Sequence, residues 1–152
     1  MTTPEYLARF IAWTKIKVRI YLKPHEKCVY FNEREIWWAH LGANIGFEQD
    51  GKNDNFERPV LVIRKFGKHT MWILPQTSKV KEGIYYHHYN FNGKNYAVIL
   101  SQIRTISSKR LIRKIRTYPK DDFAIIEDKV TALIKNDPRH CYAEVSEAEA
   151  HL

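Results

Sequence analysis

The sequence predicts a mainly β domain, a small antiparallel barrel with one helix at each end. Three observations support this. Five short runs are rich in β-branched and aromatic residues, which is typical of strands. Tight turns separate some of them, and Asn92-Gly93 is the strongest signal, because a type I′ turn needs a positive φ at both central residues. Apolar residues follow a helical period only near the two ends of the chain.

Length and composition indicate one soluble globular unit. The chain has 152 residues, of which 44% are hydrophobic, with only 6 Gly and 6 Pro. A chain of this length can bury a sizeable core. Two cysteines, Cys28 and Cys141, are too few for a disulfide framework. Basic residues within 9–19 interrupt the N-terminal apolar stretch, so we expect a cytoplasmic protein without a signal peptide or membrane span.

The first expected element is a helix in an N-terminal extension that we place at residues 1–32. Thr3 is the expected N-cap, with Pro4 at the first helical position and Glu5 in the first turn. Pro24 is the expected stop. The apolar face, expected to pack on the main domain, consists of Leu7, Ile11, Val18 and Tyr21, widened by Tyr6, Phe10 and Trp13. Basic residues on the other side leave a membrane-surface helix as the alternative.

The main domain is expected at residues 33–137. Its five strands are expected at 35–41, 59–65, 70–74, 84–91 and 95–100. The connection 42–57 is too long for an ordinary hairpin, and long loops inside compact domains are often functional. A second helix begins near Pro119, with Phe123, Ile126, Val130 and Leu133 on one face. Pro138 ends it, and residues 138–152 form an acidic tail.

Several kinds of chemistry lack sequence support. There is no phosphate-binding loop, dinucleotide fingerprint, zincin motif or nucleophile elbow. Two pairs could converge on zinc, but their spacing matches no common finger: His25 with Cys28, and His140 with Cys141. His87 and His88 are consecutive in a predicted strand and so point to opposite faces, which makes joint acid–base work improbable. We expect no metal ion and no cofactor.

The charge favours a polyanionic partner. Lys and Arg number 25 against 17 Asp and Glu, a formal charge of +8. Clustered basic residues displace counterions from a phosphate backbone. Charge alone leaves RNA, DNA, an acidic protein and an anionic membrane surface as candidates.

Four segments are more specific when taken in order. They are EIWWAHLGANIGFEQDG, ERPVLVIRK, ILPQTSK and VILSQIRTISSKRL. Together they resemble the MazF/PemK toxin family of type II toxin–antitoxin systems. This resemblance implies an SH3-like barrel of the MazF/PemK/CcdB type that forms a homodimer. It also implies metal-independent cleavage of single-stranded RNA, which stops translation and growth, silencing by an acidic antitoxin, and contact with operator DNA only through the antitoxin complex.

The resemblance assigns catalytic roles to Arg58 and Thr77. In such cleavage a ribose 2′-OH attacks the adjacent phosphorus, and an arginine can stabilise the charge that develops on the phosphate oxygens. Thr77 is expected to orient the phosphate or the leaving oxygen rather than act as a nucleophile, because no base is visible beside it. The expected substrate-binding residues are Gln49, Ser78, Lys79, Gln102 and Arg104.

Some interpretations stay open. Arg104 is equally consistent with bracing the fold. Residues 104–120 hold seven basic residues and no acidic one, which predicts either an electropositive docking rim or a solvated basic helix. The sequence departs from the family at Phe47 and at about five extra residues around 52–56. A gyrase-targeting toxin on the same fold and a non-catalytic nucleic-acid-binding barrel are the alternative functions.

Overall fold

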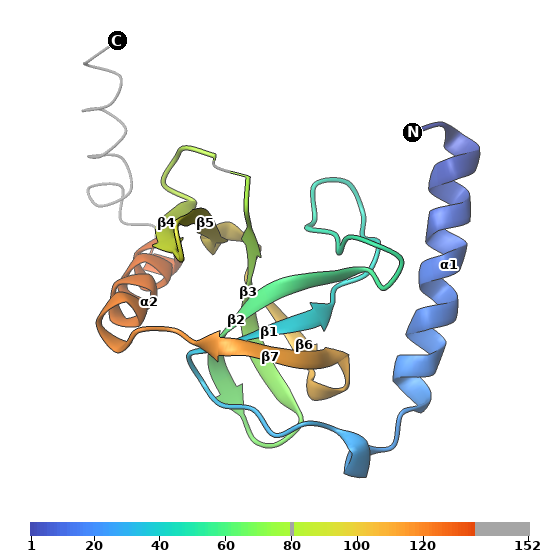
Figure 1. Cartoon of the computed structure of the whole chain (residues 1–152), viewed down its shortest axis with the longest axis horizontal. Coiled ribbons are helices and arrows are strands. Elements are labelled where there is room, and N and C mark those ends of the chain that lie inside the picture. Colours follow the sequence, from blue (N-terminus) through green and yellow to red (C-terminus); the bar gives the residue numbers. More distant parts are fainter. Residues whose placement is uncertain (80, 136–152) are drawn as a thin grey trace.

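The computed structural model describes residues 1–79 and 81–135 (Figure 1). In chain order the helices and strands are α1 (Thr3–Leu22), β1 (Glu35–His40), β2 (Glu57–Phe66), β3 (Thr70–Thr77), β4 (Tyr86–Phe91), β5 (Lys94–Ile99), β6 (Arg104–Ser107), β7 (Leu111–Thr117) and α2 (Lys120–Lys135). Three 3₁₀ turns lie between them: η1 (His25–Lys27), η2 (Leu100–Gln102) and η3 (Ser108–Arg110). Pro138 and the expected tail lie outside the described residues.

The strands form one antiparallel sheet in the order β4-β5-β3-β2-β1-β7. β3 pairs with β2 on one side, and on the other side with β6 along its first half and with β5 at its end. Among the described residues no ladder joins β7 back to β4, so the sheet is not closed. The predicted fold class, a mainly β domain with a helix at each end, is confirmed.

All five predicted strands are present. Asn92 and Gly93 have φ of 51° and 75°, which confirms the turn between β4 and β5. β6 and β7, which were not predicted, occupy the basic run, so the interpretation of that run as a helix was wrong. The last five residues of β7 are charged, polar or exposed. They therefore do not show the alternation of apolar and polar residues that marks a strand.

The cap of α1 lies one residue earlier than predicted. The N-cap is Thr2, and Thr3 is the first helical residue. This position places Glu5 three residues after the cap, where its carboxylate accepts a hydrogen bond from the Thr2 N–H. That hydrogen bond lowers the pKa of Glu5. The helix ends at Leu22, two residues before Pro24.

α1 contacts the domain through a narrower face than predicted. Trp13 is the buried residue of the helix, at 4% exposure. The residues expected on the packing face that are instead exposed are Tyr6, Leu7, Phe10, Ile11, Val18 and Tyr21. The reason is that the helix lies against η3 and the loop between β1 and β2 rather than across a sheet face (Figure 1). No described helix is long and apolar enough to span a membrane.

The sheet buries apolar side chains on both faces. Trp37, Val60 and Ile73 belong to one cluster, which also receives Phe31 from the segment before β1. Ile36, Leu61 and Leu74, their neighbours in sequence, belong to the second cluster under α2. This alternation is the period-2 pattern of strands with two covered faces. α2 contributes Phe123, Ile126 and Val130, as predicted.

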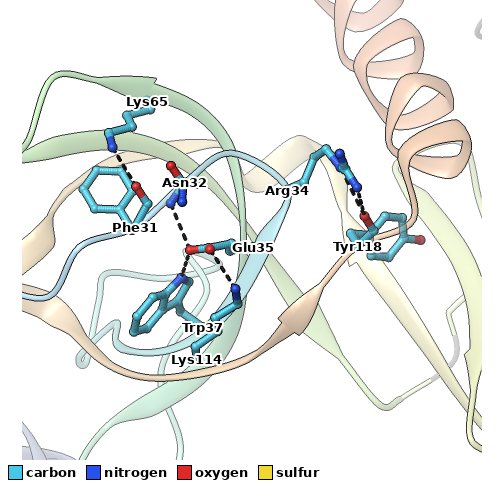
Figure 2. A network of polar contacts seen from close by, with 8 residues as sticks. All are labelled: Phe31, Asn32, Arg34, Glu35, Trp37, Lys65, Lys114 and Tyr118. Carbon is cyan, nitrogen blue, oxygen red and sulfur yellow. Dashed lines mark hydrogen bonds and ion pairs between the residues drawn. The ribbon is translucent and has the colours of Figure 1, made fainter.

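A polar network fixes the start of β1 (Figure 2). The Glu35 carboxylate accepts hydrogen bonds from the Asn32 N–H (2.9 Å), Trp37 Nε1 (2.9 Å) and Lys114 Nζ (2.8 Å). Beside it, Arg34 adopts a φ of 70° and donates from Nε and an Nη to the carbonyl of Tyr118. These contacts join β1 to β7 and so hold the two ends of the domain together.

Candidate functional site

A cavity of about 650 Å³ lies where β2, β3 and β5 meet the loop between β1 and β2. Its lining combines cations, small polar groups and aromatic rings. The lining residues are Trp38, Lys52, Asn53, Glu57, Arg58, Pro59, Gln76, Thr77, Ser78, Lys94, Asn95 and Tyr96. The cavity therefore joins residues from four strands and the long loop.

Arg58 lies in this cavity and is 6% exposed. Its Nε donates to the carbonyl of Asp50 at 2.6 Å, and an Nη donates to the carbonyl of Gln76 at 3.0 Å. Burial lowers the pKa of Arg58, and the nearby Asp50 carboxylate opposes this shift. Both hydrogen-bond acceptors are neutral carbonyls, so within residues 1–79 and 81–135 the guanidinium is held in place without a carboxylate ligand. Such a cation is suited to an incoming anion.

Thr77 and Ser78 lie beside Arg58 because β3 ends there, next to β2 and β5. The Thr77 hydroxyl accepts a hydrogen bond from the Lys79 N–H at 3.1 Å. This bond turns the chain sharply after the strand and orients the hydroxyl oxygen. The structure thus brings together three predicted site residues: Arg58, Thr77 and Ser78.

Gln49, Gln102 and Arg104 do not line the cavity. Gln102 accepts from the Gln49 N–H at 3.1 Å and donates to the Phe47 carbonyl at 3.0 Å. Arg104 donates to the carbonyl of Leu41 at 3.5 Å, and burial lowers its pKa. These contacts brace the loop between β1 and β2, so substrate binding by Gln49, Gln102 and Arg104 stays a prediction.

Several cavity residues were not predicted from the sequence. Trp38 and Tyr96 add rings, Lys52 and Asn53 come from the extra loop residues, and Lys94 lies at the start of β5. Trp38 could have been predicted from the alternation of side chains along β1. Its neighbour Trp37 belongs to the core, so Trp38 lies on the other face of the strand. The other residues depend on which strands and loops become neighbours.

The electrostatics of the cavity favour an anion. Partial desolvation lowers the pKa of the exposed Lys52, and the positive charges of Arg58 and Lys79 add to the effect. Lys79 is therefore near the site, although it does not line the cavity. Glu57 is a carboxylate in the lining, and it pairs with Arg113 at 3.0 Å. A phosphate in this cavity would have Lys52, Arg58 and Lys94 in the lining around it, with the rings of Trp38 and Tyr96 available for base stacking.

The described residues contain no group of three or more His, Cys, Asp or Glu side chains that could hold a metal ion. Cys28 is a free thiol, and its Sγ lies 3.7 Å from the Pro24 carbonyl. His140 and Cys141, the other half of the zinc alternative, lie outside the described residues. His87 is buried in β4 and His88 is exposed, as their alternation predicted.

Comparison with solved structures gives the fold. MazF from Deinococcus radiodurans is 20% identical, with a TM-score of 0.57, over 70% of this chain and 98% of that one. The Mycobacterium tuberculosis toxin MazF-mt6 is 16% identical, with a TM-score of 0.52, over 67% and 97%. A mycobacterial endoribonuclease in complex with its cognate antitoxin is 11% identical, with a TM-score of 0.50, over 70% and 95%. No curated protein sequence matches.

Comparison with protein families shows to which family this chain is related. Residues 32–134 match the family described as the PemK-like, MazF-like toxin of type II toxin–antitoxin systems. The match covers more than half of the chain and includes all seven strands, most of α2 and every residue that lines the cavity. It begins after α1. The chain therefore belongs to the PemK-like, MazF-like toxins of type II toxin–antitoxin systems.

Proposed function

We propose that this toxin is a metal-independent, sequence-specific endoribonuclease that cleaves single-stranded RNA and so inhibits translation and growth. The observation that carries the proposal is the buried Arg58 beside Thr77 and Ser78 in one cavity, where carbonyls hold it and no described carboxylate pairs with it. A structural neighbour is described as an endoribonuclease with its cognate antitoxin, which supports the same reading.

In the proposed reaction a ribose 2′-OH attacks the adjacent phosphorus. The bond from phosphorus to the 5′ oxygen breaks, the 2′-OH loses its proton, and the departing 5′ oxygen gains one. The products are a 2′,3′-cyclic phosphate and a 5′-OH. Arg58 stabilises the extra negative charge on the non-bridging oxygens through charge-assisted hydrogen bonds. Its two carbonyl contacts fix its direction, so little reorganisation is needed during the reaction.

Thr77 has a positioning role at the phosphate. Its hydroxyl oxygen accepts from the Lys79 N–H, which leaves the hydroxyl proton available to a phosphate oxygen or to the leaving oxygen. Trp38 and Tyr96 supply rings on which flanking bases can stack. The sequence preference is then set by the shape of the cavity and of the loop beside it.

The proposed partners follow the same reasoning. We propose a homodimer in the cytoplasm, silenced by an acidic antitoxin and brought to operator DNA only through the antitoxin complex. The formal charge of +8 favours an acidic partner. MazF of Deinococcus radiodurans, a structural neighbour, is also seen in complex with MazE.

Controlled expression in a bacterium tests the proposal. We expect growth arrest and discrete fragmentation of transcripts with the wild-type chain, and loss of both with Arg58→Ala. Removal of the main charge-stabilising donor should reduce the cleavage rate by roughly 10²–10³. The matched control is Arg64→Ala on the same strand, whose side chain is 63% exposed and lies 3.6 Å from Glu33. Arrest with cleaved gyrase–DNA complexes and intact transcripts would contradict the proposal.

A further inference from the structure

The loop between β1 and β2 folds back on itself next to the cavity. The Lys52 N–H donates to the Glu57 carbonyl at 2.8 Å, and the Glu57 N–H donates to the Lys52 carbonyl at 2.9 Å. Asn53 and Phe56 have positive φ values, 61° and 50°, which close this turn. Lys52 is therefore paired through two backbone hydrogen bonds with Glu57, the first residue of β2, and Glu57 immediately precedes Arg58.

The N-terminal helix holds this turn from outside. Phe56 is 2% exposed and packs against Trp13, with ring centroids 5.6 Å apart. Arg9 lies over the Phe56 ring at 4.4 Å and donates to the Gly51 carbonyl at 2.9 Å. A Cβ on Gly51 would lie 1.8 Å from the Phe56 carbonyl oxygen, so only glycine permits this close approach. α1 and the extra loop residues thus form one packed unit.

The side chain of Lys52 faces cations without a counter-ion. It lines the cavity with Arg58 and Lys94, and within the described part of the chain its ammonium forms no ion pair. The Glu57 carboxylate in the same lining already pairs with Arg113. Mutual repulsion among neighbouring cations is relieved when an anion binds between them.

We infer that Lys52 is a further substrate-binding residue, whose ammonium contacts an RNA phosphate next to the one that Arg58 holds. The inference rests on the proposed function and extends it to a residue of the long loop. It also gives α1 a role, because Arg9 and Trp13 position the turn that carries Lys52. The substrate contacted is the backbone of single-stranded RNA, independent of base sequence.

Binding to an uncleavable RNA tests the inference. A mixed-sequence, single-stranded 2′-O-methyl RNA has no free 2′-OH to attack, and its affinity can be measured by fluorescence anisotropy over a series of salt concentrations. One lost phosphate contact on a single strand should reduce the slope of log K against log salt by about 0.7. We expect Lys52→Ala to show this reduction. Its affinity should be about tenfold weaker, because one charge-assisted hydrogen bond is lost. Lys52→Arg should restore both values.

Lys68→Ala is the matched control, because Lys68 is an exposed lysine in the turn between β2 and β3. It should leave the slope unchanged, and all variants should keep the wild-type unfolding midpoint. An unchanged slope in Lys52→Ala, or an equal reduction in Lys68→Ala, would overturn the inference even if the wild type cleaves RNA. Binding with the expected slopes but no cleavage of unmodified RNA would instead support Lys52 and overturn the proposed function.

Discussion

Arg58 combines a fixed direction with a positive charge that forms no direct ion pair among the described residues. Its two hydrogen bonds reach carbonyls on different segments, Asp50 in the loop and Gln76 in β3. A guanidinium can make both bonds and still direct its remaining in-plane N–H donors at a phosphate, whereas an ammonium is a compact point charge. The geometry of the group, in addition to its charge, should therefore matter for cleavage.

The substitution Arg58→Lys tests that claim. Lysine keeps the positive charge but cannot reproduce the two-segment contact, so we expect cleavage well below the wild type and above Arg58→Ala. Single-turnover cleavage of a long RNA measures the three rates side by side. Equal rates for Arg58→Lys and the wild type would show that charge alone is sufficient.

Glu35 should make stability depend on pH. Burial alone would raise the pKa of this carboxyl, but hydrogen bonds from Lys114, Asn32 and Trp37 outweigh burial and lower it (Figure 2). Because the folded state favours the carboxylate, the stabilisation is complete above the ordinary carboxyl pKa. It is lost as the pH falls through the lowered value.

We expect Glu35→Gln to reduce the free energy of unfolding by about 1–2 kcal/mol at pH 7, since the amide replaces a charge-assisted acceptor. The difference from the wild type should shrink in acid, where the wild-type carboxyl is also neutral. Urea unfolding at several pH values measures it, with Glu26→Gln in η1 as the exposed control. A pH-independent difference would rule out the carboxylate as its source.

At the scale of elements, α1 and the loop between β1 and β2 act together. Trp13 lies so close to Gly42 that a Cβ there would meet its ring at 2.3 Å, and the same ring contacts Phe56. One tryptophan therefore touches both ends of the loop. Gln102 and Arg104 brace the loop from the opposite side.

The variant Arg9→Met tests this coupling. Methionine can still pack over Phe56, but the hydrogen bond to the Gly51 carbonyl is lost. We expect faster hydrogen exchange at the Lys52 and Glu57 amides and a several-fold higher KM for RNA, with kcat little changed. Arg19→Met, an exposed position of the same helix, is the control. Unchanged exchange at both amides would contradict a bracing role for α1.

The elements differ in how far their sequence predicts them. β1 to β5 follow from their β-branched and aromatic residues and from Asn92-Gly93. β7 cannot be predicted in this way, because its charged residues form ion pairs only in the folded chain. Arg113 pairs with Glu57, and Lys114 pairs with Glu35. Arg58, Thr77 and Ser78 are predictable from family motifs. Lys52 and Tyr96 are not, because only the folded loop and the strand order bring them to the cavity.

Across the whole molecule, several basic residues make contacts within the fold and others line the cavity. Lys109 donates to the Tyr21 carbonyl at 2.9 Å, and Arg116 lies 3.9 Å above the Phe91 ring. Arg113 and Lys114 are paired with carboxylates. Much of the basic run thus stabilises the fold, and its role as a docking rim stays a prediction.

Arg113 should affect RNA binding through Glu57. Without Arg113, the Glu57 carboxylate would remain in the cavity lining as an unpaired negative charge. We expect Arg113→Ala to weaken RNA binding and the added change Glu57→Gln to recover most of the loss. A double-mutant cycle on the 2′-O-methyl RNA measures the coupling. Additive effects of the two changes would contradict this explanation.

Whether this toxin is an endoribonuclease is tested most directly by cleavage of a long mixed-sequence RNA by the purified 152-residue chain in buffer with a metal chelator. We predict discrete fragments that share a short sequence at their ends and carry a 2′,3′-cyclic phosphate and a 5′-OH, with loss of these products in Arg58→Ala and Thr77→Ala. Intact RNA with the wild type, or the same fragments from both variants, would contradict the central claim.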